Sequence, residues 1–168
     1  LLALAGLALG AVPLEYQVKA SYLYHLAQFV EWPDEAFPSP DEPFVIGILG
    51  EDRFGTALDA VSDKTLRNRS ITVKRFKKIE EMVPCHLLFI SGSEQDRLPQ
   101  IFATLDHRPV LTVSEVEGGA KKGVMINFLK IDGKIRFEIH HGGAEKAKLK
   151  ISSKLLKLAV TVHGQLPS

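Results

Sequence analysis

The clearest hydrophobic pattern lies in the last third of the chain, where two runs alternate apolar and polar residues on either side of Asp132-Gly133. Both central residues of a type I′ turn need positive φ, which Asp-Gly supplies, so the pattern predicts a β-hairpin with a two-residue loop. That loop fixes the register of the strands and makes one hairpin face wholly apolar and the other mixed. The predicted cross-strand pairs are Phe128–Phe137, Ile126–Ile139, Asn127–Glu138, Met125–His140 and Leu129–Arg136.

A helix is predicted after the hairpin, packed back on the sheet. Its apolar residues recur at helical spacing: Leu155, Leu158, Ala159 and Val162. Ser152 or Ser153 stands where a side chain would cap the first turn.

Earlier in the chain, apolar runs typical of strands alternate with helical patterns. Strands are predicted at residues 44–49, 71–76, 86–90 and 110–113, and helices at residues 14–32, 52–62 and 93–105. Pro33 ends the first helix, and Ser93 is placed to cap the third, with Asp96 three residues on. Residues 71–76 alternate enough to lie near a sheet edge, whereas residues 86–90 are continuously apolar and belong at the centre.

This order predicts an α/β fold, a three-layer α/β/α sandwich on a mixed sheet of about six strands that ends in a β-hairpin and a helix. The uncharged run of residues 1–12 is too short to span a bilayer, which takes about 20 apolar residues. We interpret it as the remnant of a secretory signal peptide, with an ordinary N-terminal helix as the alternative. Residues 13–168 then form a single domain.

Composition limits the function classes. A net charge of +1 over 168 residues gives no overall electrostatic case for binding nucleic acid or an anionic membrane, and the lysines near the C-terminus fit a solvated helix face. Cys85 is the single cysteine, so no intramolecular disulfide can form. Its place at the entrance of a buried strand favours an unreactive thiol.

Reaction chemistry is not indicated, and we expect no enzyme, cofactor or metal. His140 and His141 are the only adjacent histidines, and neighbours at a strand end point in opposite directions. A hydrolase using Ser91 or Ser93 is an alternative, but the flanking G-x-S-x-G pattern is missing, and His86 or His107 would have to lie within hydrogen-bond reach.

Two polar or aromatic features have open interpretations. The first helix carries Tyr22, Tyr24, His25, Phe29 and Trp32, which either pack in the core or expose a partner or ligand surface. The Asn127–Glu138 pair is either a solvent-exposed cross-strand pair, a polar spot under the last helix, or a contact point for a partner.

Several segments, in order, resemble the YfiR family of small periplasmic proteins. They are YQVKASYLYHLAQFVEWP, FVIGILGEDRFGTALD, CHLLFIS, RPVLTVSEVEGGAKKGVMINF, GVMINFLKIDGKIRFEI and LKISSKLLKLA, which together cover nearly the whole chain beyond residue 14. The resemblance implies a non-catalytic periplasmic regulator that binds and represses an inner-membrane diguanylate cyclase and so lowers cyclic-di-GMP signalling. A sensor kinase is the other partner it suggests, and a homodimer is expected.

The contact residues that we select on this interpretation are Trp32, Glu138, Ser152, Ser153 and Lys154. The alternative function is a periplasmic small-ligand sensor that serves a histidine kinase or transporter. Its pocket would be lined by Tyr22 and Tyr24, with Trp32 or Asn127 beside them. Neither nucleic acid nor direct membrane insertion after signal cleavage is expected.

The chain departs from the family pattern at two places. It lacks partner cysteines, so disulfide-dependent behaviour should not be carried over. Relatives tend to read Asn-Leu-Asp after the second hairpin strand, where this chain reads His140-His141-Gly142. We therefore expect the following helix to lose its side-chain cap, which can cost about 1 kcal/mol, and the junction to be more mobile.

Overall fold

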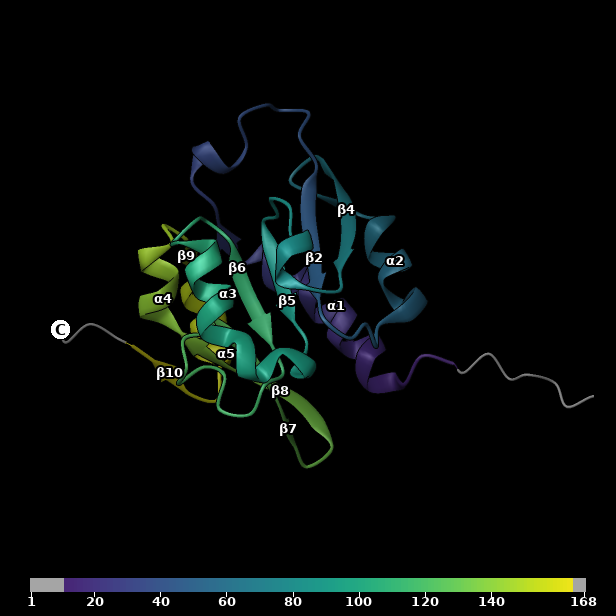
Figure 1. Ribbon diagram of the computed structural model, residues 1–168, viewed down its shortest axis with the longest axis vertical. Coiled ribbons are helices and arrows are strands. Elements are labelled where there is room, and N and C mark those ends of the chain that lie inside the picture. The colour runs from purple at the N-terminus through teal and green to yellow at the C-terminus, as the bar shows by residue number, and fades with distance from the viewer. Residues whose placement is uncertain (1–10, 165–168) are drawn as a thin grey trace, which may run out of the picture.

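An eight-stranded mixed sheet forms the centre of the computed structural model, which describes residues 11–164 (Figure 1). The predicted signal-peptide remnant lies outside the described residues, except for Ala11 and Val12. The strand order is β10-β8-β7-β6-β5-β2-β4-β3. The bounds are β2 (Phe44–Leu49), β3 (Thr65–Leu66), β4 (Arg69–Phe76), β5 (Leu87–Ile90), β6 (Leu111–Ser114), β7 (Ile126–Ile131), β8 (Lys134–His140) and β10 (Val162–His163).

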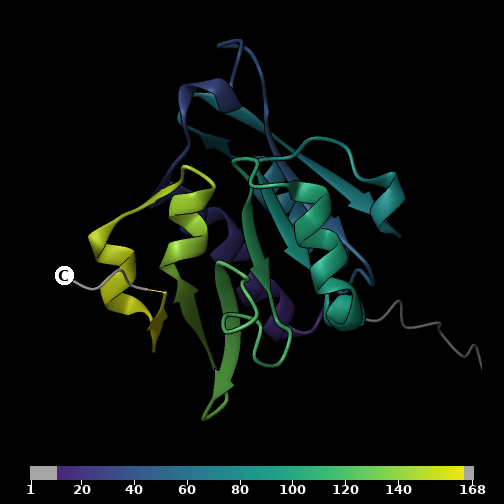
Figure 2. The ribbon, with the colours of Figure 1, turned by 60° about the vertical axis from the view of Figure 1, so that its left-hand side comes forward.

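Helices cover both faces of this sheet, which confirms the predicted α/β sandwich. Helices α1 (Leu14–Gln28) and α2 (Asp59–Ser62) lie on one face, and α3 (Leu98–Leu105) and α4 (His141–Lys146) lie on the other (Figures 1 and 2). The last helix, α5 (Ser153–Leu158), packs beside β8 at the sheet edge. Short 3₁₀ turns are η1 (Asp34–Ala36), η2 (Gly55–Leu58), η3 (Ile79–Glu81) and η4 (Gly92–Arg97).

Strands β4, β2, β5, β6 and β7 run parallel to one another, whereas β8 is antiparallel to β7 and β3 is antiparallel to β4. As predicted, β5 is central and β4 lies near an edge, with only the two-residue strand β3 outside it. The six longer strands match the predicted number. The two-residue edge strands β3 and β10 raise the total to eight, and they are too short to leave a periodic signal.

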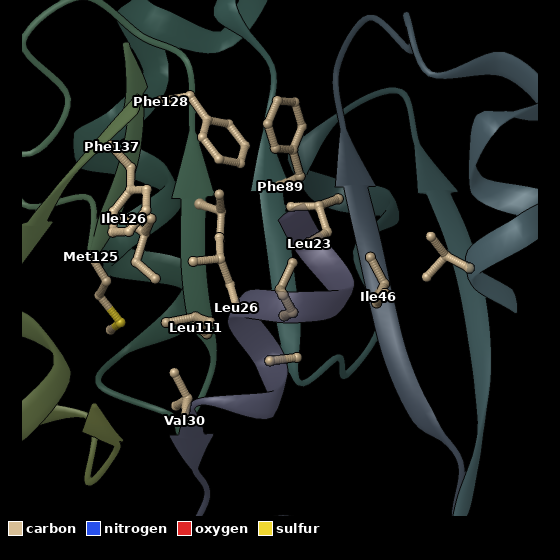
Figure 3. Close-up of a cluster of buried hydrophobic side chains, with 14 of the residues drawn as sticks. Leu23, Leu26, Val30, Ile46, Phe89, Leu111, Met125, Ile126, Phe128 and Phe137 are labelled. Carbon is tan, nitrogen blue, oxygen red and sulfur yellow. The ribbon is translucent and has the colours of Figure 1, made fainter. Parts of the chain in front are cut away.

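The larger of two hydrophobic cores lies beneath α1. Tyr16, Ala20, Leu23 and Ala27 recur at spacings of three and four residues and are all buried, so one stripe of the helix faces the sheet. Figure 3 shows α1 side chains packed over those of the strands: Leu23, Leu26, Val30, Ile46, Phe89, Leu111, Met125, Ile126, Phe128 and Phe137. The smaller core lies under α3, where Leu98 and Ile101 are buried.

The first helix is shorter than predicted. It ends at Gln28 rather than Trp32, because the following residues form β1 (Val30–Glu31), antiparallel to β9 (Lys150–Ile151). This pairing satisfies backbone groups and leaves Val30 fully buried. The pairing partner lies more than a hundred residues away, which no local helical pattern can reveal.

The predicted helices at residues 52–62 and 93–105 are also shorter. In the first, Asp52 accepts a hydrogen bond from the Phe54 amide and opens a turn, so that only Asp59–Ser62 is α-helical. In the second, α3 begins at Leu98, with Pro99 in its first turn, where a missing N–H costs nothing. The predicted cap at Ser93 is wrong, since its hydroxyl accepts from the Glu51 amide at 3.0 Å.

The hairpin register agrees with the prediction throughout the paired strands, including Phe128 opposite Phe137 and Ile126 opposite Ile139. Asp132 and Gly133 have φ of 51° and 75°, as a type I′ turn requires. One face of the hairpin therefore enters the larger core.

The segment after the hairpin differs from the prediction in two respects. Ser152 does cap α5, accepting from the Leu155 amide at 3.2 Å, but the helix ends at Leu158, and Val162 lies in β10, opposite Ile139 of β8. The predicted loss of a cap at the family's acidic position is wrong. His140 Nδ1 accepts a hydrogen bond from the Gly143 amide at 2.9 Å, so an imidazole caps α4.

Asn127 is fully buried, so the predicted exposed pair with Glu138 is wrong, although the two are opposite in register. Asn127 Nδ2 donates to the Val116 carbonyl at 2.8 Å, and its Oδ1 accepts from the Ser114 hydroxyl at 2.7 Å. The side chain therefore ties β7 to β6 and to the turn after β6.

Replacing Asn127 with Ala should lower the free energy of unfolding by about 2 kcal/mol, because the Ser114 hydroxyl and the Val116 carbonyl lose buried partners. Urea denaturation followed by circular dichroism measures the change. The control Arg136→Ala, at an exposed position of β8, should stay within about 0.5 kcal/mol of wild type. Equal effects of the two substitutions would contradict this role for Asn127.

Candidate partner-binding surface

Three of the predicted contact residues form the start of α5. The Ser152 backbone N–H donates to the Phe29 carbonyl at 2.9 Å, so this turn is fixed to the end of α1. Its hydroxyl caps the helix, while Ser153 and Lys154 are exposed. The structure thus presents Ser153 and Lys154 to solvent on a rigidly held helical turn.

Large apolar side chains are exposed at the end of α5, after it, and at Phe29, which contacts its start. Phe29 is 37% exposed, Leu158 64% and Val160 50%, while Leu155 points inward from α5 and is buried. Exposed apolar residues that gather on one segment mark interaction sites more often than isolated ones do. We name this region the α5 surface: Phe29, Ser152, Ser153, Lys154, Leu158 and Val160.

Glu138 lies next to the segment that follows α5. The Val160 amide donates to the Phe137 carbonyl and the Ile139 amide to the Thr161 carbonyl, which places residues 160–163 along the outer edge of β8. Glu138 Oε1 is 3.5 Å from His163 Nε2, and the Glu138 side chain is largely covered. Glu138 therefore borders the α5 surface without being freely exposed.

Trp32 is separate from these residues and mostly buried. Its Nε1 donates to the His86 carbonyl at 3.0 Å, and its ring meets Phe44 edge to face. One side lines a cleft of about 560 Å³ between the β1 end and the α4–β9 segment. Most of the Trp32 side chain packs in the core, and little of it is exposed at the surface of the protein.

The residues predicted for a ligand pocket are not brought together. The Tyr22 ring packs near Phe128 and Phe137, and the Tyr24 hydroxyl donates to the Thr65 carbonyl at 2.9 Å. Asn127 lies on the opposite face of the sheet, in the network with Ser114. These three side chains point in different directions from different faces.

The hydrolase alternative fails on geometry. Ser91 follows β5 and His86 precedes it, which separates their backbones by about 16 Å at about 3.3 Å per strand residue. His107 follows α3 and lies near Val110, at the same amino end of the sheet as His86. Neither serine therefore has one of these histidines within hydrogen-bond reach.

A polar cluster at the carboxyl edge of the sheet contains none of the predicted site residues. Lys19 of α1 is buried and lies 2.6 Å from Glu115 Oε2, and the Tyr16 hydroxyl donates to the same carboxylate. Burial, followed by the nearby Glu115 charge, raises the pKa of Tyr16 to about 12. Tyr16 and Lys19 are three residues apart on the buried stripe of α1, and that spacing was the available signal.

Cys85 and His86 behave as buried structural groups. Burial raises the pKa of the Cys85 thiol to about 12, in agreement with the predicted unreactive thiol. His86 Nδ1 accepts from the Val45 amide, so its Nε2 carries the proton and donates to the Ala36 carbonyl at 2.9 Å. Burial lowers the pKa of His86, despite the opposing Ala36 hydrogen bond.

The sequence matches the YfiR/HmsC-like family over residues 16–160, which is most of the chain. The protein belongs to the YfiR/HmsC-like family. Comparison with curated proteins finds no match. Among residues 11–164, no helix is both long and apolar enough to cross a lipid bilayer.

The lowered pKa of His86 predicts a pH dependence of stability in the acidic range. The unfolded chain takes up a proton at this residue near its ordinary pKa of 6.5, whereas the folded protein takes it up only at lower pH. The His86 contribution is therefore present above pH 6.5 and is lost as the pH falls below it.

Denaturation of wild type and His86→Gln between about pH 7.5 and about pH 5 tests this expectation. The difference in unfolding free energy between the two proteins should shrink as the pH falls, because only wild type loses the His86 contribution. A difference that stays constant over this range would contradict it.

Proposed function

We propose that this protein is a non-catalytic periplasmic regulator that binds the periplasmic domain of an inner-membrane diguanylate cyclase and represses it. Membership of the YfiR/HmsC-like family carries this proposal, because the family is one of regulators rather than enzymes. The sensor-kinase partner and the homodimer stay predictions.

The α5 surface is the contact region that we favour. Leu158 and Val160 are apolar and exposed, and Lys154 beside them is a cation that an acidic partner residue could meet. Because Leu155 is buried and Ser152 caps the helix, α5 offers these side chains in a fixed arrangement. Such a surface loses little conformational entropy on binding.

A ligand sensor with a tyrosine-lined pocket is less well supported. Tyr22, Tyr24 and Asn127 point in different directions, which weakens the case for a pocket that they share. Trp32 does line the cleft beside β1. Binding of a protein partner, by contrast, requires an exposed surface and no pocket.

Leu158→Asp should abolish repression. A charge at the centre of an apolar contact removes buried apolar area and leaves a carboxylate buried without a partner. This should weaken partner binding by more than about tenfold. In cells that lack the gene, wild type supplied in trans should lower cyclic-di-GMP, and the variant should not. The matched control is Ile131→Asp at the hairpin tip, which is 40% exposed and should repress like wild type.

Both substitutions are at exposed positions, so both variants should unfold at the wild-type temperature, which a thermal melt verifies. Repression by Leu158→Asp that equals repression by Ile131→Asp would overturn the assignment of the α5 surface. Unchanged cyclic-di-GMP on expression of wild type would overturn the proposed function itself.

A further inference from the structure

A cleft of about 330 Å³ lies between α3 and α4, at the amino ends of β6 and β7. Its interior is apolar. Phe102 and Leu105 of α3, Val110 and Met125 before the two strands, and Ala147 after α4 line it. Val110, Met125 and Ala147 are buried in the fold, so the floor is a continuation of the protein interior. This volume is in the range of small-molecule sites, about 300 to 1,000 Å³.

Every ionisable side chain that lines the cleft is basic. The residues come from three separate segments and comprise Arg108 and His107 after α3, Lys121 and Lys122 before β7, and His140 and Lys146 at α4. None of the carboxylates in residues 11–164 lies within 4.0 Å of the four Arg and Lys side chains, which would constitute an ion pair.

Two acidic residues next to these segments, Asp106 and Glu145, do not line the cleft. Glu145 Oε1 lies 3.7 Å from His141 Nε2, outside the cleft. The potential within the cleft is therefore set by cations above an apolar floor. Long Lys and Arg stems can lie along apolar surface while their charged ends converge on a bound anion.

The backbone holds this arrangement in place. Gly123 has φ of +111°, a conformation that favours glycine, and a Cβ there would be in ordinary van der Waals contact with the Phe102 ring at 3.4 Å, so this loop packs against α3. On the other side, His140 Nδ1 accepts from the Gly143 amide, which leaves its Nε2 as a proton donor. The basic side chains of the cleft are thus carried on segments that pack against the core or are held by hydrogen bonds.

We propose that this cleft binds a small amphiphilic anion, a carboxylate or phosphate carried on an apolar body. The apolar floor would bury the apolar part of the ligand. Arg108, with Lys121, Lys122 and Lys146, would bind its anionic head. A ligand with only the apolar body or only the anionic head would make just half of these contacts. The proposal does not depend on the proposed repressor function, because the α5 surface shares no residue with the cleft.

Binding of octanoate to the full chain, followed by calorimetry and by amide NMR shifts at Gly123 and Gly143, tests the proposal. Octanamide is the neutral isostere, and inorganic phosphate is the anion without an apolar body. Octanoate should bind at least about tenfold more tightly than either, because each comparison compound lacks one half of the interaction. Its affinity should fall as salt is raised.

Arg108→Glu/Lys122→Glu should weaken octanoate binding by at least about tenfold. The control Lys64→Glu/Lys134→Glu makes the same change in net charge at exposed positions elsewhere and should bind octanoate like wild type. Both altered pairs are exposed, and circular dichroism verifies that the fold is retained.

Three results would overturn the proposal: no octanoate binding to wild type, equal binding of octanoate and octanamide, or equal losses in the two double variants. A lipid surface carries the same chemistry as a free amphiphile. Co-sedimentation with phosphatidylglycerol vesicles that depends on Arg108 and Lys122, without binding of octanoate, would overturn the assignment to a soluble ligand.

Discussion

The type I′ turn at Asp132-Gly133 constrains more of this fold than any other local feature. Because side chains alternate along a strand, the register it fixes decides which face each residue of β7 and β8 joins, and a slip of one residue would exchange the faces. In the observed register, Phe128 and Phe137 complete the core beneath α1, and Asn127 reaches Ser114 on the other face. The same register leaves the outer edge of β8 to receive residues 160–163, which places α5 at the sheet edge.

Three polar contacts order the C-terminal segment, each at the start or the end of an element. His140 caps α4, β9 pairs with β1 immediately after α1, and Ser152 caps α5. The two caps stabilise the first turns of α4 and α5, and the β9–β1 pairing joins the chain between these helices to the end of α1. The C-terminal segment therefore contributes residues to two surfaces of different chemistry. One is basic above an apolar floor, and the other exposes apolar side chains beside a lysine.

Local signals predicted the parts of the fold that local physics decides. The hairpin, the central position of β5 and the cap at Ser152 follow from turn chemistry, apolar runs and short-range hydrogen bonding. The β1–β9 pairing could not be predicted, because two-residue strands have no periodicity and their partners are distant. The burial of Asn127 depends on Ser114 and Val116 across the sheet, and the basic cleft assembles Arg108, Lys122 and Lys146 from three segments. Of the predicted contact residues, Ser153 and Lys154 are exposed, whereas Trp32 is mostly buried.

Covalent capture in living cells tests most directly whether the α5 surface contacts a membrane cyclase. A photocrosslinking residue would replace Leu158 in one strain and Ile131 in another, and adducts would be identified by mass spectrometry. We expect an adduct at position 158 with the periplasmic part of an inner-membrane diguanylate cyclase, and none with that protein at position 131. A cyclase adduct at position 131 but not at position 158, or adducts at position 158 only with proteins that are not cyclases, would contradict it.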